Sequence, residues 1–181
     1  ARNLGRLALR PLAHLDPIGT AMIVFAGFGW GKPTPVDPNR LNPGPKPGMA
    51  VVAMAGPISN VTVAVAAALP LNAGLIDERY VGLYRYVGGS GDLIAYVFGS
   101  LIFWNLLLAT FNLIPIAPLD GFKIALGVLP QELAGQFAQL ERYGPMILLG
   151  VIMLEYILPG PGILSSIIGP VLDALIELVV G

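Results

Sequence analysis

The sequence contains no cysteine and little charge. The absence of cysteine excludes disulfides, thiolate metal ligands and cysteine nucleophiles. Only 12% of the 181 residues are charged, against about 25% in a typical soluble domain. The ten Lys and Arg residues form no basic run and the net charge is -1, so no electrostatic footprint for nucleic acid exists. Because 55% of the residues are hydrophobic, lipid is the better solvent for most of this surface.

Long stretches without charge predict membrane-spanning helices. Residues 49–71 and 93–116 carry no charged side chain, and each exceeds the roughly 20 residues needed to cross a bilayer core. Two further apolar stretches, 144–158 and 163–180, are separated by Pro-Gly-Pro-Gly and either span the membrane or form a hairpin within one leaflet. We therefore expect an all-α multi-pass membrane protein with about three to four membrane helices.

The N-terminal region has a different character. Apolar and polar side chains alternate at residues 5–9, which is typical of a strand. Residues 17–30 are apolar, but a helix of this length rises only about 21 Å against a core of about 30 Å, which favours a re-entrant or half-membrane element. Six prolines make residues 31–48 a loop, with one edge strand at 32–36. A small β-sheet or re-entrant region near the N-terminus is therefore predicted.

These features divide the chain into three regions. Residues 1–48 form the β-sheet and half-membrane loop region, and residues 49–122 form a core pair of membrane helices. Residues 123–181 begin with a short amphipathic helix at the membrane surface, predicted within 122–143, and continue with the C-terminal membrane segments.

Basic residues predict the orientation of the spans. Two arginines lie in the loop between the first two spans, whereas eight basic residues lie on the other side, and cytoplasmic loops carry the excess. We expect a cell-membrane protein whose N-terminal loops and Asp120 face the cytoplasm. The eight residues are Arg2, Arg6, Arg10, Lys32, Arg40, Lys46, Lys123 and Arg142.

Asp120 is the polar residue placed at the greatest energetic cost. It follows a helix end broken by Pro115 and Pro118, where freed carbonyl groups need partners or water. An ionisable group at membrane depth usually marks a functional interior. Its carboxylate could bind a divalent metal, or it could cap the helix that follows through Gly121. The spacing alone does not separate these alternatives.

Asparagine side chains within the predicted spans are further candidates for a functional interior. Asn60 is in the first span and Asn112 is in the second. Such amides commonly form hydrogen bonds between helices. Alternatively, both point into a shared cavity, where they contact the backbone of a substrate peptide or stabilise an oxyanion.

The remaining ionisable residues do not complete a zinc site. His14, the single histidine, lies beside Asp16, where a structural hydrogen bond is favoured over metal binding. Zinc sites need three or four His, Cys, Asp or Glu ligands, and one histidine without cysteine does not supply them. Glu155, Asp173 and Glu177 are assigned to helix ends or a polar stripe, without a chemical role.

Four sequence blocks, in this order, resemble the site-2-type intramembrane zinc proteases, peptidase family M50. The most specific is Asn-x-x-Pro followed by Leu-Asp-Gly. The blocks are Pro11-Leu-Ala-His14-Leu-Asp16-Pro17-Ile-Gly19-Thr, Gly31-Lys-Pro33 with Pro35-Val, Ala55-Gly56-Pro57 with Asn60, and Asn112-Leu-Ile-Pro115 with Pro118-Leu-Asp120-Gly121.

The resemblance implies membrane helices around a buried zinc ion, with a small sheet region at residues 5–48. The implied zinc ligands are Asp120 and two histidines of a His-Glu-x-x-His motif on a first core helix, whose glutamate is the general base. Asn60 and Asn112 correspond to asparagines that act at the substrate or transition state. Zinc, membrane lipids and a transmembrane substrate peptide are thus the implied ligands.

No His-Glu-x-x-His motif occurs in these 181 residues. One hypothesis is a metalloprotease whose catalytic helix lies just upstream of Ala1. The alternative is a non-catalytic, protease-like scaffold subunit that binds a partner in a larger membrane complex. On either hypothesis we expect this chain alone to bind no zinc and to cleave no peptide.

Overall fold

The computed structural model describes residues 17, 36–76, 90–157, 160 and 162–181. The chain divides into two compact units, Ala1–Leu41 and Asn42–Gly181, which are described separately. In the first unit, a short 3-10 helix, η3 (Pro38–Arg40), begins after Asp37. The Asp37 carboxylate accepts a hydrogen bond from the Asn39 amide (3.1 Å) and pairs with Arg40 Nε (3.2 Å).

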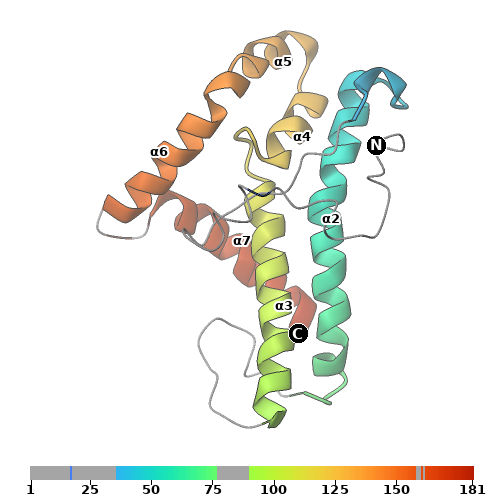
Figure 1. Cartoon of the computed structure of the whole chain (residues 1–181), viewed down its shortest axis with the longest axis vertical. Coiled ribbons are helices and arrows are strands. Elements are labelled where there is room, and N and C mark those ends of the chain that lie inside the picture. Colours follow the sequence, from blue (N-terminus) through green and yellow to red (C-terminus); the bar gives the residue numbers. More distant parts are fainter. Residues whose placement is uncertain (1–16, 18–35, 77–89, 158–159, 161) are drawn as a thin grey trace. The chain divides into compact units, whose positions relative to one another are not determined.

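The second unit is built entirely of helices in its described part (Figure 1). In chain order these are α2 (Pro45–Asn72), α3 (Ser90–Asn112), α4 (Asp120–Val128), α5 (Gln131–Ala138), the 3-10 helix η5 (Glu141–Tyr143), α6 (Gly144–Ile157) and α7 (Ile163–Val180). No strand occurs in the described residues of either unit, so the N-terminal sheet is unsupported. The predicted strands at 5–9 and 32–36 and the half-membrane element at 17–30 lie almost entirely outside those residues.

Four helical segments of the described chain are long and apolar enough to cross a membrane, which confirms the predicted helical class and agrees with the expectation of about three to four membrane helices. They are Pro45–Asn72, Leu93–Asn112, Gln131–Glu155 and Ile163–Val180. The third covers α5, η5 and α6 together, because α6 alone has only 14 residues.

Prolines explain where the observed helices differ from the predicted ones. The first span begins at Pro45 rather than at residue 49, because proline is tolerated in the first turn of a helix. The second helix ends at Asn112, three residues before Pro115, rather than at residue 116. The single surface helix predicted within 122–143 is instead two helices, α4 and α5, separated at Leu129 and Pro130.

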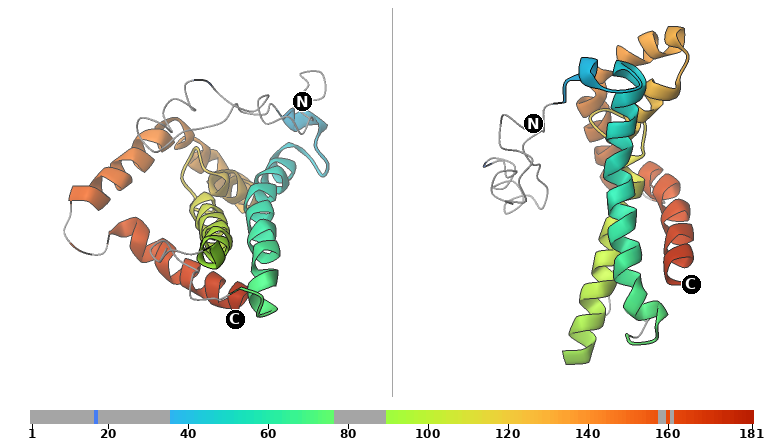
Figure 2. Two further views of the ribbon diagram at one scale, coloured as in Figure 1. Left: turned by 60° about the horizontal axis from the view of Figure 1, so that its bottom comes forward. Right: turned by 90° about the vertical axis from the view of Figure 1, so that its right-hand side faces the viewer.

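Alanines of α2 and large apolar side chains form the buried contact between the membrane helices. Helices α2 and α3 run antiparallel and side by side, and α7 packs across both (Figures 1 and 2). Alanines on α2 allow close approach of the backbones, which is the usual basis of helix association in lipid. The buried cluster comprises Ala64, Ala67, Ala68, Leu71, Ile102, Leu106, Ile114, Leu119, Ile168, Leu172 and Val179. Many large apolar side chains elsewhere on these helices are exposed, as expected of surfaces that face lipid.

Candidate functional site

The site is built on the loop that connects α3 to α4. After Asn112 the chain makes consecutive tight turns, in which the Ile116 amide donates to the Ile114 carbonyl (2.8 Å) and the Leu119 amide donates to the Ile116 carbonyl (2.9 Å). These turns end at Asp120, the first residue of α4. The loop thus satisfies part of its own backbone and delivers a carboxylate to the start of a helix, where the dipole favours negative charge.

Gly121 allows the loop to close. It is buried, and a Cβ at this position would overlap the backbone carbonyl groups of Leu113 and Ile114. Those atoms belong to the main chain and cannot rotate away as a side chain can. The Leu-Asp-Gly sequence therefore requires glycine for packing at this point, next to the candidate ligand.

The Asp120 carboxylate lies directly against the backbone of α2 at Gly56. A Cβ built on Gly56 would be 2.7 Å from Asp120 Oδ2, closer than real Cβ contacts. Gly56 precedes Pro57, which lacks an amide hydrogen, and the Ser59 hydroxyl donates to the Gly56 carbonyl (2.7 Å). Two segments that are 64 residues apart in sequence are thus brought together at one carboxylate.

The surroundings of Asp120 disfavour its charged form. The residue is half-buried, and this burial raises the pKa of its carboxyl group above the usual range, although the Lys123 ammonium group lowers it in part. A bound cation would reverse this preference, because it stabilises the carboxylate directly. The position is therefore costly for a free carboxylate and favourable for one that binds a cation.

An apolar groove runs between α2 and α4. It has a volume of about 490 Å³ and is lined by Ala50, Val51, Met54, Ala55, Ile58, Ser59, Ile124 and Val128. Asp120, Ile124 and Val128 are spaced by four residues, so they follow one another along one face of α4. On α2, Ala55 directly precedes Gly56, and Ser59 follows Gly56 within one helical turn. The groove thus lies between the helices that carry Gly56 and Asp120, although Asp120 itself does not line it.

The two predicted asparagines lie close to this arrangement along the chain. Asn60 is one helical turn after Gly56, and Asn112 is the last residue of α3. Both side chains are half-buried, and neither forms a hydrogen bond to another described residue. Asn105, which the sequence reasoning did not consider, donates instead to the Leu101 carbonyl of its own helix (2.8 Å). The roles of Asn60 and Asn112 therefore stay predictions.

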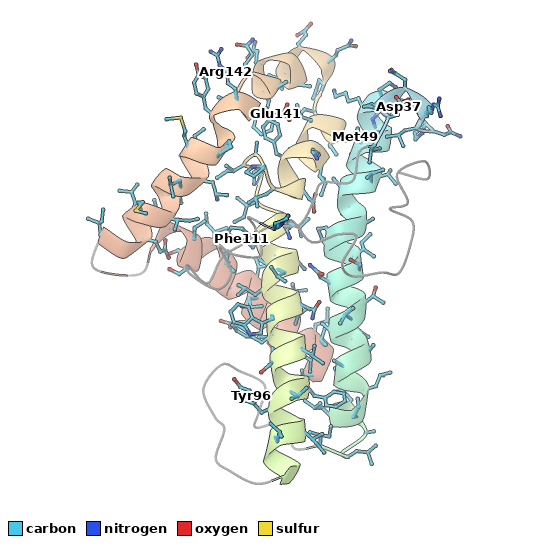
Figure 3. The ribbon with its side chains drawn as sticks, in the orientation of Figure 1. Asp37, Met49, Tyr96, Phe111, Glu141 and Arg142 are labelled. Carbon is cyan, nitrogen blue, oxygen red and sulfur yellow. The ribbon has the colours of Figure 1, made fainter. Side chains whose placement is uncertain are left out.

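Charged side chains gather at the end of the unit that carries α4. Figure 3 labels Glu141 and Arg142 beside the start of α6, and labels Tyr96 toward the opposite end of α3. Arg142 lies over the Tyr143 ring, 4.4 Å from its centre. This end is suited to a membrane–water interface, where aromatic rings and long basic side chains are favoured.

Asp120 is suited to be one zinc ligand but does not form a zinc site with its described neighbours. No group of three His, Cys, Asp or Glu side chains occurs within the part of the chain that the structure describes. His14 lies outside that part. Carboxylate oxygen is an ordinary zinc ligand, so Asp120 could supply one ligand of a zinc site, and the further ligands would have to come from other residues.

Sequence reasoning missed two residues of this region. The sequence marks Gly56 only as part of a motif, and its contact with Asp120 depends on the docking of α4. The sequence indicates only a loop charge at Lys46, yet its ammonium group donates to the Leu129 carbonyl at the end of α4 (2.6 Å). Its position within a proline-rich stretch gave no signal of this contact.

The chain is similar to a protein of Bacillus subtilis (strain 168) described as "Putative zinc metalloprotease YwhC". The two sequences are 37% identical over 149 residues, which cover 82% of this chain and 65% of that protein. The chain thus spans slightly less than two thirds of its relative's length. No family model matches the sequence. No solved structure matches it either. The similarity supports a relationship between this chain and zinc metalloproteases. The four candidate membrane spans are consistent with an integral membrane protein.

Proposed function

We propose that this chain forms the larger part of a site-2-type intramembrane zinc metalloprotease of family M50, in which Asp120 supplies one zinc ligand. The observation that carries the proposal is the half-buried Asp120 carboxylate, which lies against Gly56 of α2 at the end of a loop closed by Gly121. The similarity to a zinc metalloprotease supports the same assignment.

The described residues supply only part of such a site. The two histidines and the glutamate of a His-Glu-x-x-His motif would come from a segment not contained in this sequence. A zinc ion bound there would lower the pKa of a coordinated water toward about 7 and so supply a nucleophile. The role of this chain is to hold Asp120 at a fixed place beside α2.

The groove and the amides suggest how a substrate would be held. The groove between α2 and α4 is lined by apolar side chains and by Ser59, whose hydroxyl is already bonded to its own helix. Such a surface favours an apolar segment of a membrane protein over a soluble peptide. The amide groups of Asn60 and Asn112, which form no side-chain hydrogen bond within the described residues, could donate to the backbone of that segment or to a developing oxyanion.

The distribution of basic residues supports an orientation for this arrangement. We place the end that carries α4, Lys123 and Arg142 on the cytoplasmic side of the cell membrane. The partners in the proposal are membrane lipids and a transmembrane substrate, with no role for nucleic acid.

The test is the zinc content of the natural full-length protein, purified in detergent, with Asp120→Ala compared to Asp173→Ala. Asp173 is an exposed carboxylate on α7 and so controls for the loss of one negative charge. We expect about one zinc per wild-type and Asp173→Ala chain, a large loss in Asp120→Ala, and a parallel loss of cleavage of a transmembrane reporter in vesicles. Equal zinc in all three proteins would remove Asp120 from the site. A wild-type protein without zinc or cleavage would favour the non-catalytic scaffold.

A further inference from the structure

Lys46 makes a long-range contact that none of its sequence neighbours predicts. Its Nζ donates to the Leu129 carbonyl at 2.6 Å, across 83 residues of sequence, in a partly buried position. Leu129 is the C-cap residue of α4, whose other end begins with Asp120. One ammonium group therefore joins the start of α2 to the end of the helix that carries the candidate ligand.

The position of Lys46 is unfavourable for its own helix. It is the second residue of α2, where the helix dipole presents partial positive charge and where acidic residues are preferred. The C-terminal end of α4 presents the opposite charge, together with carbonyl groups that lack partners within the helix. The side chain thus moves its charge from an unfavourable helix end to a favourable one, and the resulting hydrogen bond is charge-assisted and short.

Two further contacts place α4 antiparallel along the first part of α2. Gly127 lies so close to Ala50 that a Cβ at Gly127 would overlap the Ala50 methyl group. Asp120 lies against Gly56 at the other end. Along α2 the contact points are thus 46, 50 and 56, and along α4 they are 129, 127 and 120. This order fixes the register of one helix on the other.

The register of α4 determines where the Asp120 carboxylate lies. Each helical residue rises about 1.5 Å, so a slip by one residue would move Asp120 about 1.5 Å along α2. Functional groups must be held within about 0.5 Å of their productive geometry. The glycine and alanine contacts depend on close packing, whereas the hydrogen bond from Lys46 to the Leu129 carbonyl is directional.

We propose that Lys46 is a positioning residue: by holding the Leu129 carbonyl it fixes α4 along α2 and thereby fixes the Asp120 carboxylate against Gly56. The proposal rests on the proposed function only where it concerns zinc. The position of α4 itself can be measured without any metal.

The experiment compares Lys46→Met with Lys46→Arg in the natural full-length protein in detergent. Methionine retains most of the aliphatic stem and loses the donor, whereas arginine retains a cationic donor. Arg142→Met is the matched control, because it removes a surface cation that contacts Tyr143 rather than α4. Hydrogen exchange by mass spectrometry is read over residues 120–129 in protein stripped of metal by chelation, and zinc affinity is read by competition with a chelating dye.

We expect Lys46→Met to accelerate exchange in α4 by about tenfold and to weaken zinc binding by about tenfold, the lower end of the effect of residues that support metal ligands. Lys46→Arg should restore both quantities to near wild-type, and Arg142→Met should change neither. If Lys46→Met is not recovered folded, Lys46→Leu, which also lacks a donor, is measured with the same expected direction.

Unchanged exchange over 120–129 in Lys46→Met would overturn the proposal. Faster exchange that arginine does not rescue would also overturn it, because the loss would then lie in packing rather than in the donor. Absence of zinc from the wild-type protein would instead count against the proposed function, and the exchange comparison would still decide whether Lys46 holds α4.

Discussion

Replacement of Gly56 by alanine tests the closest contact of the candidate site. The new methyl group would be 2.7 Å from Asp120 Oδ2 and 3.7 Å from its Cγ. An ordinary contact begins at 3.4 Å, so the carboxylate oxygen must retreat by about 0.7 Å if α2 stays in place. The carboxylate is the end of a flexible side chain, so it can move while the fold is kept.

A displacement of about 0.7 Å is large for a metal ligand. Oxygen–zinc distances are about 2.0–2.2 Å, and a working site tolerates deviations of about 0.5 Å. Changes that misplace a ligand without removing it typically weaken metal binding about 10–100-fold. We therefore expect Gly56→Ala to bind zinc about 10–100-fold more weakly, which corresponds to about 1.4–2.8 kcal/mol, with little change in thermal stability.

The assay is zinc affinity by competition in the natural full-length protein, with thermal unfolding measured in parallel. Gly150→Ala is the matched control, because Gly150 lies in the helix α6 and a Cβ there meets nothing within 4 Å. Both variants gain the same helix propensity, so only the contact with Asp120 differs between them. Equal zinc affinity in Gly56→Ala and Gly150→Ala would refute the inference that the Asp120 carboxylate in this position binds the metal.

Two other changes probe the same unit. Burial raises the pKa of Asp120, so its charged form opposes folding above that pKa and has no cost below the unfolded value near 3.9. Asp120→Asn should therefore stabilise the metal-free protein at neutral pH, and this gain should vanish near pH 3. Thermal unfolding measured across this pH range checks the expectation. Glu155 accepts hydrogen bonds from the Leu164 and Ser165 amides (2.9 and 3.0 Å) in the first turn of α7. Its replacement by alanine should accelerate hydrogen exchange at these two amides while residues 170–180 keep their protection, and unchanged exchange there would contradict the capping role.

The membrane helices could be predicted because lipid leaves few alternatives. A long stretch without charge must satisfy its own backbone in a helix, so residues 49–71 and 93–116 identified α2 and α3 to within a few residues. Pro45 and Pro115 account for the shifted ends, since proline is accepted in a first turn but prevents continuation of a helix. The sequence therefore predicts the membrane helices themselves but not the exact residues at which they begin and end.

The contacts that form the site could not be predicted in the same way. Asp120 was identified from the broken helix before it, which is a local signal, but its position against Gly56 depends on how α4 docks on α2. Lys46 was read as a loop charge because prolines surround it, and its partner Leu129 is 83 residues away. Glu155 was given no chemical role because the amides that it binds follow a Pro-Gly turn, nine and ten residues later.

These contacts share a physical cause. Apolar side chains gain little by leaving lipid for a neighbouring helix, so packing distance and directional polar contacts must fix the position of a helix. The nine-residue α4 lies outside the four candidate spans, and it touches α2 through Gly127 and through Asp120 at Gly56, with Lys46 closing the far end. Because α4 approaches α2 most closely at Gly127 and at Gly56, an added methyl group there, or loss of the Lys46 donor, should perturb α4 more than apolar exchange in the groove beside it. The placement of the carboxylate should therefore be sensitive to substitutions at Gly56, Gly127 and Lys46.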